Sequence, residues 1–380
     1  MTIVFWVLAA FWFLYTINRL RAAGAVPALI LPNDRDRDRA LPRVSVIIAA
    51  RNEQERIERT VRGILGQTGI DLELWLVDDR SDDATPRILE RLREEDPRLN
   101  VLRVDELPED WLGKPHACHL AARRATGDWL LFSDADVWMC EDAIARAVSM
   151  ATLGGADHFC MFPAEHRTTF MSRAGLVFLV TMFSTIPARV NRDRWFAFVG
   201  IGAFNLVRAE AYREIGGHEA LRFEVIDDAK MGLLMKRAGF RTRVADSAGA
   251  IEVEWASDLL RLITALEKNM FAMFNYSLAL AVTVFLCLAG AWTLGVVGPL
   301  TGGAAGWAAG AGLLSTALPG LILARRAGFG PVEALLSPLM MPVLLTAIAH
   351  STFATLRQGG VRWRGTFYPL ARLRREQVRW

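Results

Sequence analysis

Long apolar runs lie at the two ends of this chain, and its middle alternates short apolar runs with polar segments. Residues 1–17 are almost uninterruptedly apolar and carry no charge, and further apolar runs occupy 277–298, 302–323 and 332–354. Such runs are long enough to span a bilayer. The middle of the chain carries nearly all the acidic residues. The pattern predicts an enzyme-like domain inserted between N-terminal and C-terminal membrane helices.

The middle domain opens with a β-branched run, Val44–Ala49, as expected for a strand buried on both faces. A helix is then expected to begin at residues 50–53 and to run to about residue 66. Further strands are predicted over 72–77, 99–104 and 129–133, with helices between them, the last over 114–125. This alternation predicts an α/β fold with a mostly parallel central sheet and helices on both of its faces.

The strand at 129–133 runs directly into Asp134-Ala135-Asp136. If the extended conformation persists, the side chains of Asp134 and Asp136 point to the same face. Two such carboxylates at the carboxyl end of a strand suit Mg²⁺ or Mn²⁺ that carries substrate phosphates. That end of an open α/β sheet is also where ligands bind. The same motif occurs in ordinary surface turns, so by itself it leaves both interpretations open.

Acidic residues follow two other predicted strands at the same end. Glu53 follows the first strand, and Asp78 and Asp79 end the second. Because the carboxyl ends of parallel strands lie side by side, these carboxylates are expected to converge on one crevice. Residues 81–83 also suit the capping of the next helix. No G-x-G-x-x-G follows the first strand, which disfavours a dinucleotide-binding site.

Two further carboxylates, Asp227 and Asp228, lie in the first turn of a predicted helix with an apolar stripe. Carboxylates in this position complement the helix dipole. A carboxylate fixed at a helix N-terminus can also accept a proton from a reacting hydroxyl. The residues alone leave the structural and the catalytic role open.

The chain resembles the family 2 glycosyltransferases of the GT-A fold. Five motifs carry the resemblance across residues 43–253: VSVIIAARNE, LWLVDDRSDD, GKPHACHLAARRATGDWLLFSDADV, GIGAFNLVRAEAYREIGGHE and EVIDDAKMGLLMKRAGFRTRV. The resemblance implies a nucleotide-sugar site in which Ala50 and Glu53 contact the nucleoside, and Asp78 or Asp79 holds the base and ribose. It also implies that Lys114 lies near the donor, and that Asp134 contacts the donor and binds the metal together with Asp136. By the same resemblance, Asp228 is the general base.

Two positions depart from the familiar pattern of this family. Asp227-Asp228 stands where Glu-Asp is usual, and residues 265–271 stand where many membrane-bound members carry Q-x-x-R-W or R-x-x-R-W. The second departure argues against a processive synthase of the cellulose or chitin type. This part of the chain and the later VRWRGTFY are similar to the lipid-modifying branch, which includes ceramide glucosyltransferases, carotenoid glycosyltransferases and hopanoid-associated enzymes.

Charges beside the apolar runs predict the orientation in the membrane. Arg19 and Arg21 follow the first run, which by the positive-inside rule places the middle domain in the cytosol, at the inner or plasma membrane. Arg325-Arg326 follow the third run, so a fourth full span would send the arginine-rich tail outside. The fourth run, which contains Pro338 and Pro342, is therefore expected to be re-entrant or to lie along the interface.

The expected organisation has six parts. The parts are an anchor over 1–24, a linker over 25–42 with a charged stretch at 33–39, a GT-A domain over 43–256, an interfacial helix over 257–276, membrane helices over 277–356 and a basic membrane-surface tail over 357–380. Within the GT-A domain, the apolar segment 174–188 could be a core helix or an interfacial one.

We interpret the chain as an inverting, metal-dependent glycosyltransferase with Mg²⁺ or Mn²⁺ as cofactor. It would move one sugar from a nucleotide sugar, expected to be UDP-linked, to a hydroxyl of a membrane lipid, and no nucleic-acid partner is expected. One alternative is a polyprenyl-phosphate sugar transferase, whose acceptor is already ionised. Another is a non-catalytic membrane transporter or lipid-binding protein.

Overall fold

The computed structural model describes residues 1–30 and 40–380, and the chain divides into two compact units. The charged stretch Asn33–Arg39 falls outside the described residues. We call the first unit the helical unit; it comprises Met1–Val26, Arg167–Ala188 and Trp255–Arg375. We call the second the sheet unit; it comprises Pro27–His166, Arg189–Glu254 and Glu376–Trp380.

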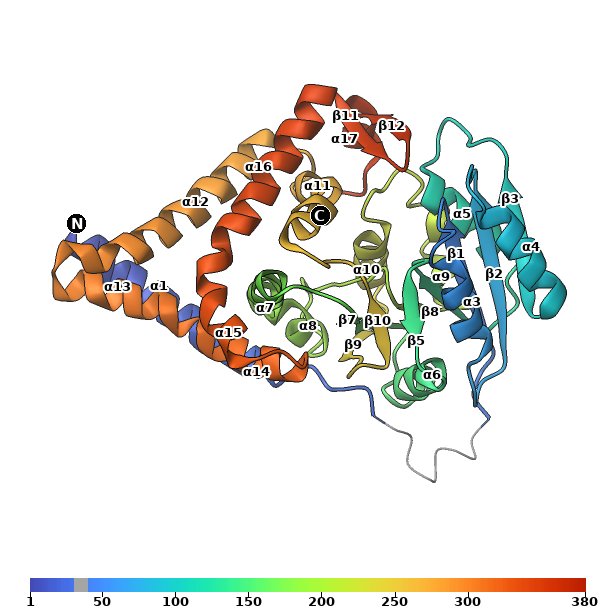
Figure 1. Ribbon diagram of the computed structural model, residues 1–380, viewed down its shortest axis with the longest axis horizontal. Helices are drawn as coiled ribbons and strands as arrows, with labels where there is room; N and C mark the ends of the chain where they lie inside the picture. Colours follow the sequence, from blue (N-terminus) through green and yellow to red (C-terminus); the bar gives the residue numbers. More distant parts are fainter. Residues whose placement is uncertain (31–39) are drawn as a thin grey trace. The chain divides into compact units, whose positions relative to one another are not determined.

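The sheet unit is built on a seven-stranded sheet with the order β3-β2-β1-β4-β8-β6-β9 (Figure 1). Strand β8 runs antiparallel to β4 and β6, and the other neighbours are parallel, which confirms the predicted α/β fold with a mostly parallel sheet. The strands are β1 (Val44–Ala50), β2 (Leu72–Asp79), β3 (Leu99–Val104), β4 (Trp129–Ser133), β6 (His158–Phe162), β8 (Asn205–Arg208) and β9 (Thr242–Asp246).

Helices cover both faces of this sheet, because side chains alternate along each strand. Val44, Val46 and Ile48 of β1 face one apolar cluster, and Ile47 faces the other. The first cluster is completed by α3 (Ile57–Leu65), α4 (Thr85–Glu95) and α6 (Ala143–Leu153). The second is completed by α5 (Gly113–Ala122), α9 (Ala209–Glu214) and α10 (Asp227–Arg237). A small sheet of β5 (Val137–Met139), β10 (Ile251–Val253) and β7 (Ala164–Glu165) completes the strands of this unit.

The helical unit contains α1 and the helices that follow the central domain. Five helical segments among the described residues are long and apolar enough to cross a membrane: Thr2–Ala23, Phe170–Val190, Leu278–Thr301, Ala304–Arg326 and Pro331–Gln358. They are built from α1 (Thr2–Ala23), α7 (Phe170–Phe183), α8 (Thr185–Val190), α12 (Leu278–Val297), η2 (Gly298–Thr301), α13 (Ala304–Ser315), α14 (Ala317–Arg326), α15 (Pro331–Leu336), η3 (Ser337–Met340) and α16 (Met341–Gln358).

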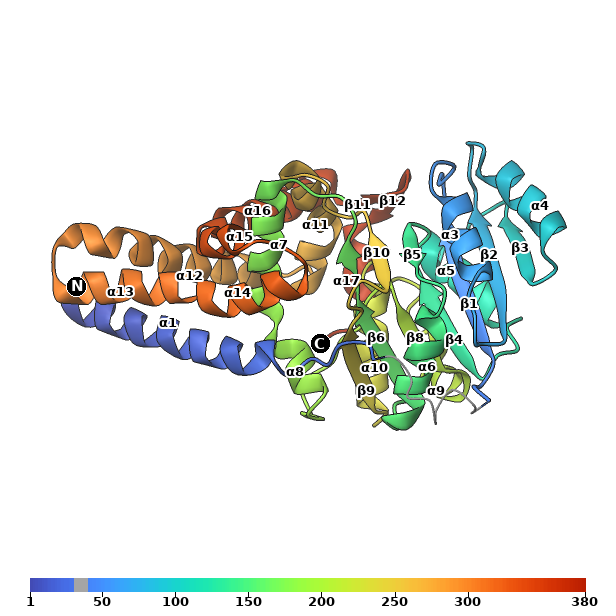
Figure 2. The ribbon, with the colours of Figure 1, turned by 60° about the horizontal axis from the view of Figure 1, so that its bottom comes forward.

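Small residues allow the helices of this unit to approach closely. Figure 2 shows α1 beside α13, and Trp12 packs there against Ala309 and Leu313. A Cβ on Gly312 would lie only 3.0 Å from the Cβ of Trp12. Small-xxx-small stripes favour such packing in membranes. Large apolar side chains on α1, including Ile3 and Leu14, remain exposed, as expected for a surface that faces lipid.

The segment expected as an interfacial helix over 257–276 forms α11 (Leu259–Met273). Its buried side chains, among them Leu262, Leu266 and Met270, pack with α7 and α16. The residues of the predicted basic tail form a hairpin of β11 (Gly360–Trp363) and β12 (Thr366–Pro369), followed by α17 (Leu370–Glu376). Residues 376–380 belong to the sheet unit.

Candidate active site

The candidate site lies at the carboxyl edge of the central sheet. Strand β1 lies between β2 and β4, and in the register of these strands Ala50 is opposite Asp78 and Ile48 is opposite Ser133. The strand ends that carry Ala50, Asp78 and Asp79 therefore meet, and Asp134 follows directly after the neighbouring strand. This is the edge at which open α/β sheets bind ligands.

The Asp134-Ala135-Asp136 segment is a turn and not a continuation of the strand. Strand β4 ends at Ser133, and β5 begins at Val137. The expectation that the two carboxylates face the same way because the backbone stays extended is therefore wrong. The turn is fixed instead by two hydrogen bonds: the Thr60 hydroxyl donates to the carbonyl oxygen of Ala135 (2.8 Å), and the Ser133 hydroxyl donates to that of Ala203 (2.8 Å).

The loop after β1 is joined to the loop after β2 by side-chain hydrogen bonds. The backbone N–H groups of Asn52 and Glu53 donate to the hydroxyls of Ser81 (3.0 Å) and Thr85 (2.9 Å). The helix expected at residues 50–53 begins only at Ile57, because Asn52 adopts a left-handed conformation with φ of 56° that turns the chain. Glu53 is buried in this connection. The two loops thus form one wall beside Ala50.

The residues expected to cap the next helix act just outside it. Oδ1 of Asp83 accepts a hydrogen bond from the Thr85 backbone N–H (2.8 Å), while its Oδ2 accepts one from that of Gln54 (3.1 Å). The N-cap residue of α4 itself is Ala84, which offers no side-chain acceptor. Asp83 therefore both steadies the start of α4 and joins the two loops.

Asp78 and Asp79 are both buried, but their carboxylates differ in their partners. Oδ1 of Asp78 accepts a hydrogen bond from the backbone of Ser81 (3.1 Å), whereas Oδ2 is buried, lies 4.0 Å from Nε of Arg103 and accepts no hydrogen bond from the residues that the structure describes. Both oxygens of Asp79 are bound by the guanidinium group of Arg80 (2.8 and 3.1 Å). Buried carboxylate oxygens need hydrogen-bond donors, so Asp78 offers an acceptor for a ligand.

Lys114 lies in the first turn of α5 and connects the site's carboxylates. Its Nζ donates to Oδ1 of Asp134 (2.6 Å) and lies 4.0 Å from Oδ1 of Asp227. Burial alone would lower the pKa of this ammonium group, but the carboxylates of Asp134, Asp227 and Asp228 outweigh burial and hold the pKa well above its ordinary value. Lys114 therefore remains positively charged in the site.

Asp228 occupies the first turn of α10, as predicted, and lies close to Asp134. Burial and the neighbouring charge of Asp227 raise the pKa of Asp228 to about 6. Gly202 lies against both candidate carboxylates: a Cβ there would be 2.8 Å from Oδ2 of Asp134 and 3.3 Å from Oδ2 of Asp228. Only glycine leaves the space between these two oxygens open. A carboxylate with a raised pKa beside such a space can act as a proton acceptor.

Two buried residues near Asp227, Tyr212 and His218, were not predicted as site residues from the sequence. The His218 backbone N–H donates to the Tyr212 hydroxyl oxygen (2.9 Å), and that hydroxyl lies 2.9 Å from Nδ1 of His218. Burial lowers the pKa of His218, so the ring is neutral and Nδ1 accepts a hydrogen bond from the Tyr212 hydroxyl. The ring proton then sits on Nε2, 3.5 Å from Oδ2 of Asp227. Gly217 permits this approach, because a Cβ there would lie 2.7 Å from the Tyr212 ring.

The available signal for this pair was the Gly216-Gly217-His218 pattern shortly before the two aspartates. A second missed feature is the pair of buried residues Glu224 and Lys230, which flank Asp227 and Asp228 in the sequence and both bind the backbone of Val378. The Val378 backbone N–H donates to Glu224, and the ammonium group of Lys230 donates to the Val378 carbonyl oxygen. The Lys230 ammonium group also lies 3.3 Å from the centre of the Trp380 ring. Residues 376–380 thus pack on α10, the helix that carries Asp228.

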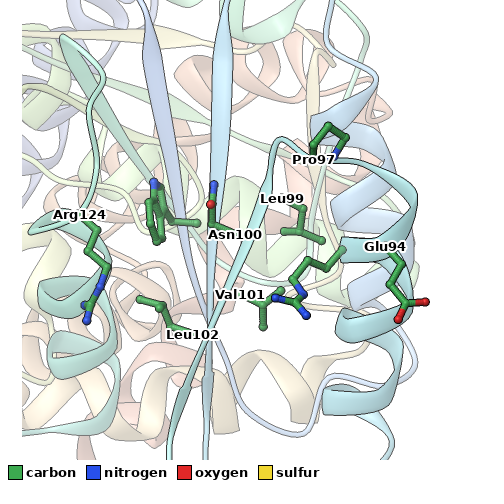
Figure 3. A pocket seen from close by; sticks show the side chains of 9 residues that line it. Glu94, Pro97, Leu99, Asn100, Val101, Leu102 and Arg124 are labelled. Atoms are coloured by element: carbon green, nitrogen blue, oxygen red, sulfur yellow. The ribbon is translucent and has the colours of Figure 1, made fainter.

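A concave surface elsewhere on the sheet unit lies beside the edge strand β3 (Figure 3). It contains none of the predicted site residues, so it is a separate feature from the site described above. Its lining includes Trp75, Glu94, Leu99, Asn100, Leu102 and Arg124.

The carboxylate set fits a hard divalent cation that is shared with a ligand. Asp134 and Asp136 could each offer carboxylate oxygens to such a cation, and Gly202 leaves space beside Asp134. No three His, Cys, Asp or Glu side chains group closely enough to hold a metal by themselves within residues 1–30 and 40–380. Mg²⁺ is commonly held by one or two carboxylates together with substrate phosphates, and this site offers that arrangement.

The mostly parallel central sheet with helices on both faces has the GT-A-like α/β fold. A solved structure with the same overall fold is mannosyltransferase PcManGT from Pyrobaculum calidifontis in complex with GDP-Man and Mn²⁺, with a TM-score of 0.57 and 20% sequence identity over 92% of this chain and 98% of that one. The family model "Glycosyl transferase family 2" matches residues 45–216 of this chain.

Two curated relatives share this domain. The 4,4'-diaponeurosporenoate glycosyltransferase of Staphylococcus haemolyticus (strain JCSC1435) is 32% identical over 203 residues, which cover 51% of this chain and 52% of that protein. Its counterpart from Staphylococcus aureus (strain USA300) is 28% identical over 197 residues, 50% of each chain. The chain spans about half the length of these curated relatives.

Proposed function

We propose that this protein transfers a single sugar from a nucleotide sugar, UDP-linked, to a hydroxyl group of a membrane lipid with inversion at the anomeric carbon. The observation that carries the proposal is the grouping of Lys114, Asp134 and Asp228 around the space beside Gly202, at the carboxyl edge of the sheet. A transferase of this kind needs a nucleoside site, charge compensation for the leaving diphosphate and an acceptor for a proton. The site offers a candidate for each.

Ala50, Glu53, Asp78 and Asp79 form the proposed nucleoside site. The buried oxygen of Asp78 that accepts no hydrogen bond from the described residues suits an N–H or O–H donor of the base or ribose. Asp79 is held in place by Arg80 and supports the wall of the site. The Asp78 side chain is therefore the direct contact in this proposal, and the Asp79–Arg80 pair lies beside it.

Asp134 and Asp136 are the proposed ligands of Mg²⁺ or Mn²⁺. A bound divalent cation would neutralise negative charge on the donor diphosphate as the bond to the sugar breaks. Lys114 adds a fixed positive charge at the same place, since the surrounding carboxylates keep its pKa high. Lys114 thus both holds the Asp134 carboxylate and orients the donor phosphates.

Asp228 is the proposed general base. It accepts the proton of the lipid hydroxyl as the oxygen attacks the anomeric carbon from the side opposite the diphosphate, and this in-line displacement inverts the configuration. The first turn of α10 fixes the Asp228 backbone, and Oδ1 accepts a hydrogen bond from the Ala229 backbone N–H (2.7 Å). Oδ2, which lies beside the Gly202 space, is the oxygen proposed to accept the proton.

The acceptor is proposed to be a carotenoid-type or similar membrane lipid. Two observations support a lipid: the five segments able to cross a membrane and the names of the curated relatives. Those names also favour a second candidate, because 4,4'-diaponeurosporenoate denotes a carboxylate, an oxygen nucleophile that is already ionised. A polyprenyl phosphate would share that property, and neither acceptor would need Asp228 as a base.

The proposal is tested with the purified full-length protein in lipid nanodiscs. It is incubated with UDP-sugars or GDP-sugars, Mn²⁺ and a lipid extract; the products are identified by mass spectrometry, and their anomeric configuration is determined by NMR. We expect a glycolipid of inverted anomeric configuration to form from a UDP-sugar, and to be absent in excess chelator or with Asp136→Ala. Transfer that persists in chelator would reject the metal, and transfer from a GDP-sugar alone would reject the UDP donor.

A further inference from the structure

The sheet unit exposes two large aromatic side chains on one short segment, Asn191–Phe196, which we call the tryptophan loop. Trp195 is 83% exposed and Phe196 is 48% exposed, and their rings meet edge to face at 5.5 Å. Arg189 lies over the Phe196 ring at 5.6 Å. A contiguous aromatic pair on the surface of a folded unit marks a place of interaction.

The tryptophan loop is held firmly to the sheet, so its exposed rings do not result from a frayed end. The Asn191 side chain exchanges two hydrogen bonds with the backbone of Val244 in β9 (2.9 and 2.8 Å). Asp193, which has a left-handed φ of 53°, accepts two hydrogen bonds from Arg243 (2.7 and 3.0 Å). These contacts fix both sides of the turn that presents Trp195.

The charges around the loop are almost entirely positive. Its one acidic residue, Asp193, is compensated by Arg243, and the ammonium group of Lys236 lies 3.5 Å from its backbone carbonyl oxygen. Arg192 and Arg194 are exposed, and neither forms an ion pair with any residue in the described ranges. The surface therefore combines an aromatic pair with unpaired guanidinium groups.

We propose that the tryptophan loop is a membrane-interface anchor that binds the surface of a bilayer containing anionic phospholipids. Tryptophan prefers the headgroup level of a membrane because its ring is apolar and its N–H is polar. Guanidinium groups bind phosphate through paired hydrogen bonds, and basic residues beside a membrane are attracted to anionic headgroups. The loop begins immediately after Phe170–Val190, one of the segments able to cross a membrane. The inference is independent of the proposed sugar transfer.

The test uses the full-length protein in nanodiscs of phosphatidylcholine, with or without phosphatidylglycerol, and in detergent micelles. Hydrogen exchange is measured for peptides that cover residues 190–198, and a phosphatidylglycerol with a photoreactive headgroup is used for crosslinking. We expect slower exchange in the anionic nanodiscs than in the other two states, and crosslinks on the tryptophan loop. Both signals should fall in Arg192→Gln/Arg194→Gln and in Trp195→Ser.

The matched control is Arg123→Gln/Arg124→Gln, which removes the same charge from exposed positions of the sheet unit. It should behave as the wild type. Equal exchange in all three states, or equal loss in the control, would overturn the proposal. Protection that grows with protein concentration in detergent would also overturn it, because a second copy of the chain would then be the partner.

Discussion

The ammonium group of Lys114 donates a 2.6 Å hydrogen bond to one carboxylate oxygen of Asp134. In the proposed function Asp134 is also a ligand of the divalent cation, so the lysine and the cation would compete for the same carboxylate. Lys114 reaches within 4.0 Å of Asp227 as well. One side chain thus links the strand-end carboxylates to those at the start of α10.

Lys114→Met should bind Mn²⁺ more tightly than the wild type in the absence of a donor, while transferring sugar more slowly. Removal of one positive charge beside Asp134 favours the binding of a cation there. We expect a gain of about 1.4 kcal/mol in binding free energy, which corresponds to an affinity for Mn²⁺ about tenfold higher. Transfer falls because the donor phosphates lose a fixed charge. Titration calorimetry with Mn²⁺ measures the first effect, and Lys236→Met is the control. Unchanged Mn²⁺ affinity would mean that Lys114 and the metal do not share Asp134.

The pH dependence of transfer should report the pKa of Asp228, which burial and Asp227 raise to about 6. A general base works in its carboxylate form, so kcat/KM should be constant above this pKa. Below it kcat/KM should fall roughly tenfold per pH unit as the carboxylate is protonated. A profile of kcat/KM from about pH 5 to about pH 8 checks this. A flat profile across that range would indicate that no carboxylate with a raised pKa limits the reaction.

The sequence predicted the sheet well because its signals are local. Continuous β-branched runs such as Val44–Ala50 can be stable only between two layers of helices, and the strand at Leu99–Val104 has the bounds expected from the chain. The position of Asp228 in the first turn of a helix also followed from the pattern. The helix after β1 was placed too early, because the left-handed Asn52 belongs to a turn that joins two loops.

The remainder of the site depends on contacts that no local pattern contains. Tyr212 and His218 meet Asp227 only through the packing of separate elements, and Gly202 matters only because Asp134 and Asp228 flank it. The same holds for Val378, which lies far along the chain from Glu224 and Lys230. Composition identified residues 357–380 as basic, but could not predict that their last residues pack on α10.

Tyr212→Phe should slow transfer about fivefold with little change in KM for the donor. The hydroxyl fixes the His218 tautomer whose Nε2 proton faces Asp227, and a hydrogen bond of this kind contributes about 1 kcal/mol. The ring packing is kept, so the melting temperature should change little. Tyr15→Phe in α1 is the control. Equal slowing in the control, or a loss of folded protein that accounts for the slowing, would contradict a positioning role for Tyr212.

Glu224→Gln and Lys230→Met should each destabilise the protein, because each leaves the other buried charge, which shares the Val378 backbone with it, without the opposite charge that compensates it. Breaking a buried pair by changing one member costs roughly 3–5 kcal/mol, whereas replacing both members is often close to neutral. Thermal unfolding of the single and double variants in detergent should therefore show lower melting temperatures for the singles and recovery in the double. Additive losses in the double variant would show that the two side chains do not act as a pair.

The role of Asp228 as the base is tested most directly by the rate of sugar transfer in Asp228→Asn compared with Asp227→Asn. Asparagine keeps the shape of the side chain but cannot accept the proton, so Asp228→Asn should bind the donor normally and transfer sugar about 10²–10⁴-fold more slowly. Asp227→Asn should be milder, since Asp227 positions Lys114 and His218. If Asp227→Asn were inactive and Asp228→Asn transferred sugar at a near-normal rate, the base would be Asp227. Near-normal transfer in both variants would contradict the account and favour an acceptor that is already ionised.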